Sequence, residues 1–141
     1  MRGPIRVLLT DDDPHIRALL RAQLESDDRF IVIGEAENGS VAVGMASELR
    51  PDAIVLDLAM PVMDGLEALP LLRLIDPKVK LAVLSGFGGR LLEDQARSLG
   101  ADIYLEKVSS ISSLGDDLFG ICDVQRGTRS PSVVREASRT V

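Results

Sequence analysis

The hydrophobic residues of this chain form short runs, rich in β-branched side chains, that each have the length of one β-strand. The runs cover residues 5–9, 30–34, 53–57, 80–85 and 101–106. Between them, apolar residues recur at the spacing of a helical face, in the groups Ile16, Leu19, Leu20 and Leu24; Val43, Ala46 and Leu49; Leu66, Leu69 and Leu72; and Leu92, Ala96 and Leu99. The pattern predicts strands that alternate with helices.

The predicted strands are apolar almost throughout, which is typical of strands buried on both faces of a sheet. Buried strands separated by helices indicate a parallel sheet with helices on both sides and right-handed crossovers. We therefore predict an α/β fold with a doubly wound, five-stranded parallel sheet of the (βα)5 type.

Local signals support this division and mark its weaker parts. Asp13 followed by Pro14 is typical of a helix start, because aspartate caps a helix and proline suits its first turn. Pro70 lies within the third helical pattern, so we expect it to kink or shorten that helix. A final helix is expected beyond residue 108, although Gly115 and Gly120 each cost roughly 1 kcal/mol in a helix interior.

Length and charge limit the number of domains and the kinds of partner that the chain can have. The 141 residues suffice for one domain, which we expect at residues 1–120. Residues 121–141 carry four arginines against Asp123 and Glu136 and have a linker-like composition, so we expect a disordered tail or truncated linker there. The formal net charge of −6 disfavours direct nucleic-acid binding through general phosphate attraction.

Cysteine content and hydropathy exclude other classes. The single cysteine, Cys122, allows no internal disulfide and no cysteine-rich zinc site. No signal peptide and no apolar run approaching the ~20 residues of a membrane span can be seen. We expect a cytoplasmic location and no membrane partner.

Polar residues end most of the predicted strands. In an open parallel sheet the functional crevice lies at the carboxyl ends of the strands, so these residues should meet at one edge. Carboxylates from separate strands repel one another unless a cation lies among them, and Mg²⁺ accepts such oxygen ligands. The strand-end residues are Asp11, Asp12 and Asp13 after the first strand, Asp57 after the third, Ser85 after the fourth, and Glu106 and Lys107 after the fifth.

This set of residues predicts phosphoryl transfer onto Asp57. A carboxylate at the floor of a metal site can attack a phosphoryl group as a nucleophile. The metal ion, a hydroxyl group and a lysine would then neutralise the three equatorial phosphoryl oxygens.

Four segments, in chain order, resemble the receiver domain of response regulators from two-component signal transduction systems. VLLTDDDPHIR resembles the acidic first loop, DAIVLDLAMPVMDGLE the phosphoacceptor segment, AVLSG the hydroxyl-bearing strand end, and GADIYLEK the lysine strand. The resemblance covers about residues 5–120. It implies a flavodoxin-like fold with strand order 2-1-3-4-5, and a phosphoacceptor switch that catalyses only its own phosphorylation and dephosphorylation.

The resemblance implies a metal-binding group and its target. Asp57 would be the phosphoacceptor and a ligand of Mg²⁺. Asp12 would bind Mg²⁺ directly, Asp11 would act mainly through water, and the backbone carbonyl of Ala59 would complete the protein ligands.

The resemblance also implies residues that sense the phosphate. Ser85 would donate a hydrogen bond to a phosphoryl oxygen, and Lys107 would pair with another. Tyr104 would be the aromatic switch residue, whose ring orientation couples to movement of the Ser85 loop. We expect Asp13 to act as a helix cap and His15 to be an exposed side chain.

Two departures from the family pattern have consequences. Val108 stands where the family usually has proline, so the conformation of the loop after Lys107 is left open. Ala59 and Phe87 flank the path of an attacking water and neither side chain can orient it, so we predict slow loss of the phosphoryl group.

The implied partners are a sensor histidine kinase or phosphotransfer protein and a downstream effector or output domain. A phosphorylation-dependent homodimer is a further expectation. Residues 121–141 are too few for a DNA-binding module, so we expect a single-domain regulator or a fragment of a longer one.

A receiver-type interaction module that ignores phosphorylation is the main alternative function. An aspartyl phosphatase is disfavoured, because Leu58 and Ala59 follow Asp57 where such hydrolases have a D-x-D arrangement.

Overall fold

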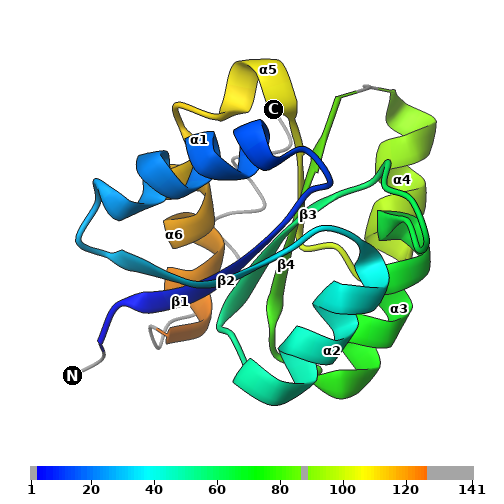
Figure 1. Ribbon diagram of the computed structural model, residues 1–141, viewed down its shortest axis with the longest axis horizontal. Coiled ribbons are helices and arrows are strands. Elements are labelled where there is room, and N and C mark those ends of the chain that lie inside the picture. Colours follow the sequence, from blue (N-terminus) through cyan, green and yellow to red (C-terminus); the bar gives the residue numbers. More distant parts are fainter. Residues whose placement is uncertain (1–2, 87–88, 127–141) are drawn as a thin grey trace.

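A five-stranded parallel sheet with helices on both faces organises the chain in the computed structural model, which describes residues 3–86 and 89–126 (Figure 1). In chain order the elements are β1 (Ile5–Thr10), α1 (Pro14–Glu25), β2 (Phe30–Ala36), α2 (Gly39–Leu49), β3 (Ala53–Asp57), α3 (Gly65–Ile75), β4 (Lys80–Ser85), α4 (Arg90–Ser98), β5 (Ile103–Glu106), α5 (Lys107–Ser110) and α6 (Leu114–Arg126). The strands lie in the order β2-β1-β3-β4-β5. The predicted doubly wound, flavodoxin-like fold with strand order 2-1-3-4-5 is confirmed.

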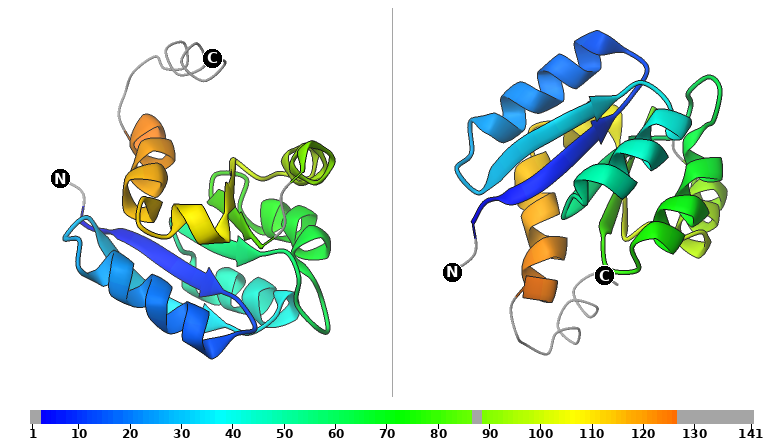
Figure 2. Two further views of the ribbon diagram at one scale, coloured as in Figure 1. Left: turned by 90° about the horizontal axis from the view of Figure 1, so that it is seen from above. Right: turned by 60° about the horizontal axis from the view of Figure 1, so that its bottom comes forward.

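The sheet separates two hydrophobic clusters, because successive side chains of a strand point to opposite faces. Leu8 of β1 packs in the cluster beneath α2, α3 and α4, whereas Val7 and Leu9 pack in the cluster beneath α1 and α6. Figure 2 shows these two helical layers on opposite sides of the strands. The three central strands, β1, β3 and β4, are apolar almost throughout because both of their faces are buried.

Helix α3 continues through Pro70, so the prediction that this proline shortens the helix is wrong. A capping box fixes the start of the helix, with reciprocal hydrogen bonds between Asp64 and Glu67. Leu69 and Leu72 are buried in the core on either side of Pro70. Capping and burial therefore outweigh the hydrogen bond that the proline cannot donate.

Helix α6 extends beyond the predicted boundary at residue 120. It runs to Arg126 and buries Leu114, Leu118 and Cys122 against the sheet. Residues 121–126 are thus helical, and the rest of the predicted tail, residues 127–141, lies outside the described residues.

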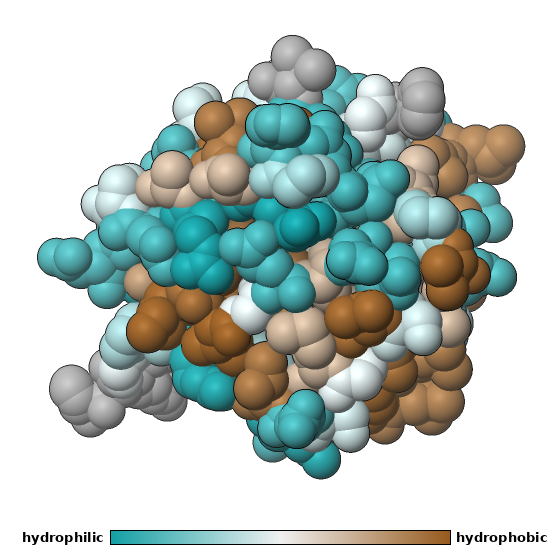
Figure 3. Space-filling view, viewed as in Figure 1, coloured by the Kyte–Doolittle hydropathy of each residue, from teal (hydrophilic) through white to brown (hydrophobic). Residues whose placement is uncertain are grey.

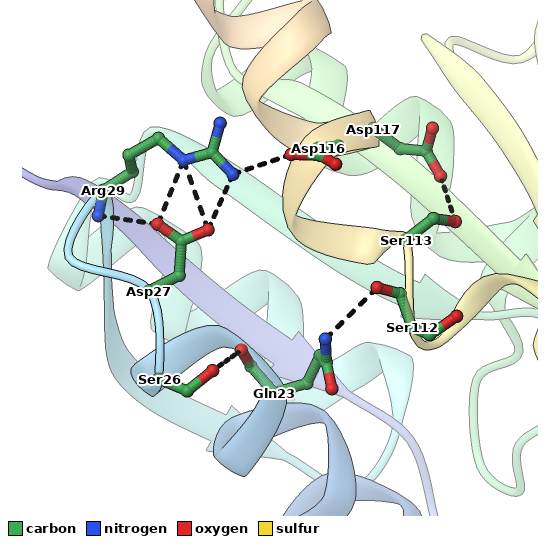
Figure 4. Close-up of polar contacts among 8 residues, drawn as sticks. All are labelled: Gln23, Ser26, Asp27, Arg29, Ser112, Ser113, Asp116 and Asp117. Carbon is green, nitrogen blue, oxygen red and sulfur yellow. Dashed lines mark hydrogen bonds and ion pairs between the residues drawn. The ribbon is translucent and has the colours of Figure 1, made fainter.

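Polar contacts join two parts of the chain (Figure 4). One part comprises residue 112 and the start of α6, and the other comprises the end of α1 and the turn before β2. The Arg29 guanidinium donates to Asp27 at 2.7 Å and to Asp116 at 2.9 Å, and it lies 4.6 Å from the ring centroid of Phe119. Gln23 Nε2 donates to the backbone carbonyl of Ser112 at 3.2 Å. These contacts hold α6 against α1 and β2 in addition to its apolar packing.

Apolar side chains also reach the surface. Figure 3 shows hydrophobic residues along its right edge, over α3 and α4. Leu74 of α3 and Leu91 of α4 are among the exposed large hydrophobic residues. Within residues 3–86 and 89–126, no helix combines the length and the apolar character that a membrane span requires.

Candidate functional site

The register of the sheet brings the predicted strand-end residues to one edge. Thr10, the last residue of β1, pairs with Leu56, so Asp11 follows β1 beside the end of β3. Asp57 pairs with Leu84, which directly precedes Ser85 at the end of β4. The predicted meeting of these strand ends is therefore found in the structure.

Three carboxylates form the centre of this edge. One carboxylate oxygen each from Asp11, Asp12 and Asp57 lies within 4.8 Å of the other two. Asp11 is fully buried, Asp57 is 4% exposed and Asp12 is exposed to solvent. The cluster is thus accessible from the side of Asp12 and closed beneath Asp11 and Asp57.

Lys107 supplies the positive charge of the cluster. Its Nζ atom lies 2.8 Å from Asp11 Oδ2 and 3.3 Å from Asp57 Oδ2. Burial disfavours the protonated amine, but the hydrogen bond to Asp11 and the charge of Asp57 outweigh it and raise the pKa of Lys107. The lysine therefore stays charged and bridges the two buried carboxylates.

Within the cluster, the surroundings of Asp57 disfavour its ionised form. Burial raises its pKa to about 6, and the neighbouring charge of Asp11 adds to the rise. Lys107 and a backbone hydrogen bond from Ala59 act in the opposite direction but do not cancel it. The pocket thus holds more negative charge than its own lysine can balance.

This charge imbalance fits a divalent cation. Three carboxylates against one ammonium leave two negative charges, which one Mg²⁺ ion would neutralise. An all-oxygen donor set with open access to water is also what Mg²⁺ favours. The residues present therefore fit the predicted metal.

The remaining predicted residues lie around the cluster. Ser85 is buried at the end of β4, and Ala59 follows Asp57 directly after Leu58. Tyr104 pairs with Val83 in the β4–β5 ladder and packs, half-buried, against the α2–α3–α4 side of the core. Phe87, the second residue behind the predicted slow dephosphorylation, lies outside the described residues.

The segment after Lys107 is helical. The short helix α5 begins at Lys107 itself, directly after β5 ends at Glu106. No cis peptide bond occurs within the described ranges. The loop conformation that Val108 left open is therefore a helical turn.

Two expectations about the first loop are confirmed. The Asp13 side chain caps α1 by accepting a hydrogen bond from the His15 backbone N–H at 2.8 Å. The His15 side chain is 96% exposed.

The sequence did not identify Arg17 as part of the site. Its Nη1 donates to the backbone carbonyl of Asp11 at 2.7 Å, while its Nε donates to Glu35 at 2.8 Å. The arginine thereby fixes the loop that carries Asp11 and Asp12. A usable signal was its position four residues after the cap Asp13, on the side of α1 that faces the loop.

Gly65 is a second residue that supports the site. A Cβ atom at this position would collide with the backbone carbonyl of Asp57, and the Gly65 N–H donates to the Leu58 carbonyl at 2.9 Å. Only glycine lets α3 begin this close to the end of β3. The glycine eight residues after Asp57 in the sequence motif marks this contact.

Comparisons with known proteins agree with the geometry. Residues 7–118 match the family model of the response regulator receiver domain. The chain is 41% identical over 119 residues to a protein-glutamate methylesterase/protein-glutamine glutaminase of Rhodospirillum centenum. The matched residues cover 82% of this chain and 30% of that protein. The chain is 36% identical over 103 residues to the chemotaxis protein CheY of Listeria monocytogenes, which covers 73% of this chain and 86% of that protein.

A solved structure has the same fold over nearly the whole chain. A two-component response regulator of the LuxR family from an Aurantimonas species superposes with a TM-score of 0.82 at 27% identity, covering 98% of both chains. The chain thus spans nearly all of this structure but only about a third of the methylesterase.

Proposed function

The chain belongs to the response regulator receiver domain family, and on this premise we propose that Asp57 is the phosphoacceptor of a two-component signalling switch. The observation that carries this assignment is the cluster of Asp11, Asp12 and Asp57 with Lys107 at the carboxyl ends of the strands. Burial and the neighbouring charge of Asp11 raise the pKa of Asp57.

The reaction transfers one phosphoryl group. A carboxylate oxygen of Asp57 attacks phosphorus, a new P–O bond forms, and the P–N bond to a donor histidine breaks. The protein-bound Mg²⁺ would offset negative charge on the phosphoryl oxygens, held by Asp11, Asp12, Asp57 and the Ala59 carbonyl.

The protein's own groups have separate parts in this step. Lys107 already lies 3.3 Å from Asp57, so a small movement brings its ammonium to a phosphoryl oxygen. Ser85 would donate a hydrogen bond from the end of the adjacent strand. Arg17 would keep the Asp11 and Asp12 loop in place through its bond to the Asp11 carbonyl.

The phosphorylated state would be communicated through Ser85 and Tyr104. Ser85 is the last residue of β4. Tyr104 lies on the neighbouring strand β5 and pairs with Val83, which is two residues before Ser85. Movement of the Ser85 loop towards the phosphate would change the packing of the half-buried Tyr104 ring. The surface formed by α4, β5 and the following helices would then shift between two states.

The implied partners follow from this chemistry. A sensor histidine kinase or a phosphotransfer protein would donate the phosphoryl group. A downstream effector or output domain, or a second copy of the chain, would recognise the phosphorylated surface. Size-exclusion chromatography with light scattering, before and after phosphorylation, tests the dimer.

Intact-mass spectrometry after incubation with acetyl phosphate and Mg²⁺ tests the proposal. We expect the mass of one phosphate to be added to the wild type, and none to Asp57→Ala or to the wild type in EDTA. Asp94→Ala, at an exposed position on α4, is the matched control and should be phosphorylated normally. Absence of phosphate on folded wild-type protein would refute the assignment.

A receiver-type interaction module that ignores phosphorylation remains the alternative function. A last helix weakened by Gly115 and Gly120 would favour this alternative, but α6 is 13 residues long and packs Leu114 and Leu118 into the core. Partner affinity with and without phosphate distinguishes the two functions, because only the switch changes its affinity.

A further inference from the structure

A cleft lies at the end of the sheet opposite Asp57, where the strands begin. Arg6 near the start of β1 and Lys80 at the start of β4 line it, together with Arg50 and Lys78. Its volume is about 780 Å³, within the range of small-molecule sites. Figure 2, right, turns the bottom of the molecule, where β3 and β4 begin, towards the viewer.

Cations without ion-pair partners gather in this cleft. Among the lysine and arginine side chains described within residues 3–86 and 89–123, six form ion pairs: Arg17, Arg21, Arg29, Arg73, Arg97 and Lys107. Of the five others in that part of the chain, Arg90 lies on α4 and the remaining four line the cleft. Four of the five described cations without an ion-pair partner therefore lie in one cleft.

The carboxylates in the cleft do not balance these cations. Asp52 accepts a hydrogen bond from the Arg6 backbone N–H at 2.9 Å, and Asp76 accepts one from the Lys78 backbone N–H at 2.8 Å. Four positive charges against two negative ones leave the cleft positive. Such a local field attracts anions even on a protein of net negative charge.

The cations differ in their availability. The Arg6 guanidinium donates hydrogen bonds to the backbone carbonyls of Arg50 and Leu49 and thereby caps the end of α2. It contributes positive charge to the cleft, but both of its terminal nitrogens already donate hydrogen bonds. Arg50 makes one long hydrogen bond to the Ile75 carbonyl, at 3.3 Å. The ammonium groups of Lys78 and Lys80 have no hydrogen bond within the described residues and are the groups left to bind a ligand.

The wall beside these charges is apolar. Ile31 and Ile33 of β2 and the buried Val79 line the same cleft, and Ile31 is exposed although it is a large hydrophobic residue. Apolar surface beside several cations suits a ligand with a ring and several phosphate groups. We propose that this cleft binds a nucleoside di- or triphosphate, with Lys78, Lys80 and Arg50 around the phosphates.

The cleft lies at the end of the strands opposite Asp57, so nucleotide binding can be measured separately from phosphorylation. Isothermal titration with ATP and GTP in EDTA and at low salt tests it, because EDTA removes any metal-bridged binding at the aspartates. We expect saturable binding that a Lys78→Gln/Lys80→Gln variant weakens at least tenfold. Arg90→Gln removes an unpaired cation outside the cleft and should change the affinity less than twofold.

Three results would overturn the assignment: no saturable binding of either nucleotide at millimolar concentration, equal weakening by Arg90→Gln, or equal affinity for inorganic triphosphate. The last would assign the cleft to simple anions. Phosphorylation of each variant by acetyl phosphate, measured by mass, shows that it is folded. It also separates failure at this cleft from failure of the Asp57 assignment.

Discussion

Neutralising Asp57 should stabilise the metal-free protein. Its carboxylate is buried beside Asp11, and the two together carry more negative charge than Lys107 balances. These surroundings raise the pKa of Asp57 from its usual 3.8 to about 6. We expect Asp57→Asn to unfold at a higher urea concentration than the wild type in EDTA at pH 7.5.

The rise in pKa gives the magnitude. At about 1.4 kcal/mol for each pH unit, the ionised carboxylate destabilises the folded state by about 3 kcal/mol at pH 7.5. Between pH 4 and 6 the folded protein binds more protons at Asp57 than the unfolded chain does, so this penalty shrinks as the pH falls. At pH 5 it should be about half as large.

The assay is urea denaturation of the wild type, Asp57→Asn and the exposed-site control Asp94→Asn at pH 7.5 and 5.0. The advantage of Asp57→Asn over the wild type should be larger at pH 7.5, and Asp94→Asn should match the wild type at both pH values. Added Mg²⁺ should stabilise the wild type and reduce the advantage of Asp57→Asn, because binding to the folded state alone adds stability. An Asp57→Asn protein equal to or less stable than the wild type in EDTA at pH 7.5 would refute the charge argument.

Three further predictions concern backbone geometry and phosphate lifetime. Val62 is 82% exposed with a φ of 67°, so Val62→Asn should raise the free energy of unfolding by about 1 kcal/mol, and a decrease would contradict the strain. A Cβ atom at Gly44 would meet nothing within 4 Å, whereas one at Gly39 would lie 2.7 Å from a backbone carbonyl. In urea denaturation, Gly44→Ala should therefore stabilise the protein by about 0.5–1 kcal/mol, and Gly39→Ala should destabilise it. Ala59→Asn should speed the loss of phosphate, measured by the decay of the phosphorylated mass, because the amide can orient water; an unchanged decay would count against this role.

The fold was predictable because its strands are buried on both faces. Runs such as residues 53–56 contain no polar side chain, so they indicate a parallel sheet between two layers of helices. The extent of two helices was not predictable in the same way. Pro70 and the glycines of α6 carry local costs, and these are outweighed by the burial of side chains such as Leu72 and Leu118, which depends on the tertiary structure.

The centre of the site was predictable for a related reason. Parallel strands place their carboxyl ends together, so Asp11, Asp57 and Lys107 had to meet once the strands were assigned. The support around them was not predictable from strand ends. Arg17 reaches the Asp11 carbonyl from a helix, and Gly65 allows a backbone approach that shows only in three dimensions.

The junction between β5 and α5 has a mechanical consequence. Strand β5 ends at Glu106 and helix α5 starts at Lys107, so no loop residue separates them. A change in the backbone of Lys107 must therefore be shared at once by the strand before it and the helix after it. Lys107 also holds the two buried carboxylates, so we expect any displacement of its backbone during phosphorylation to move helix α5 as well.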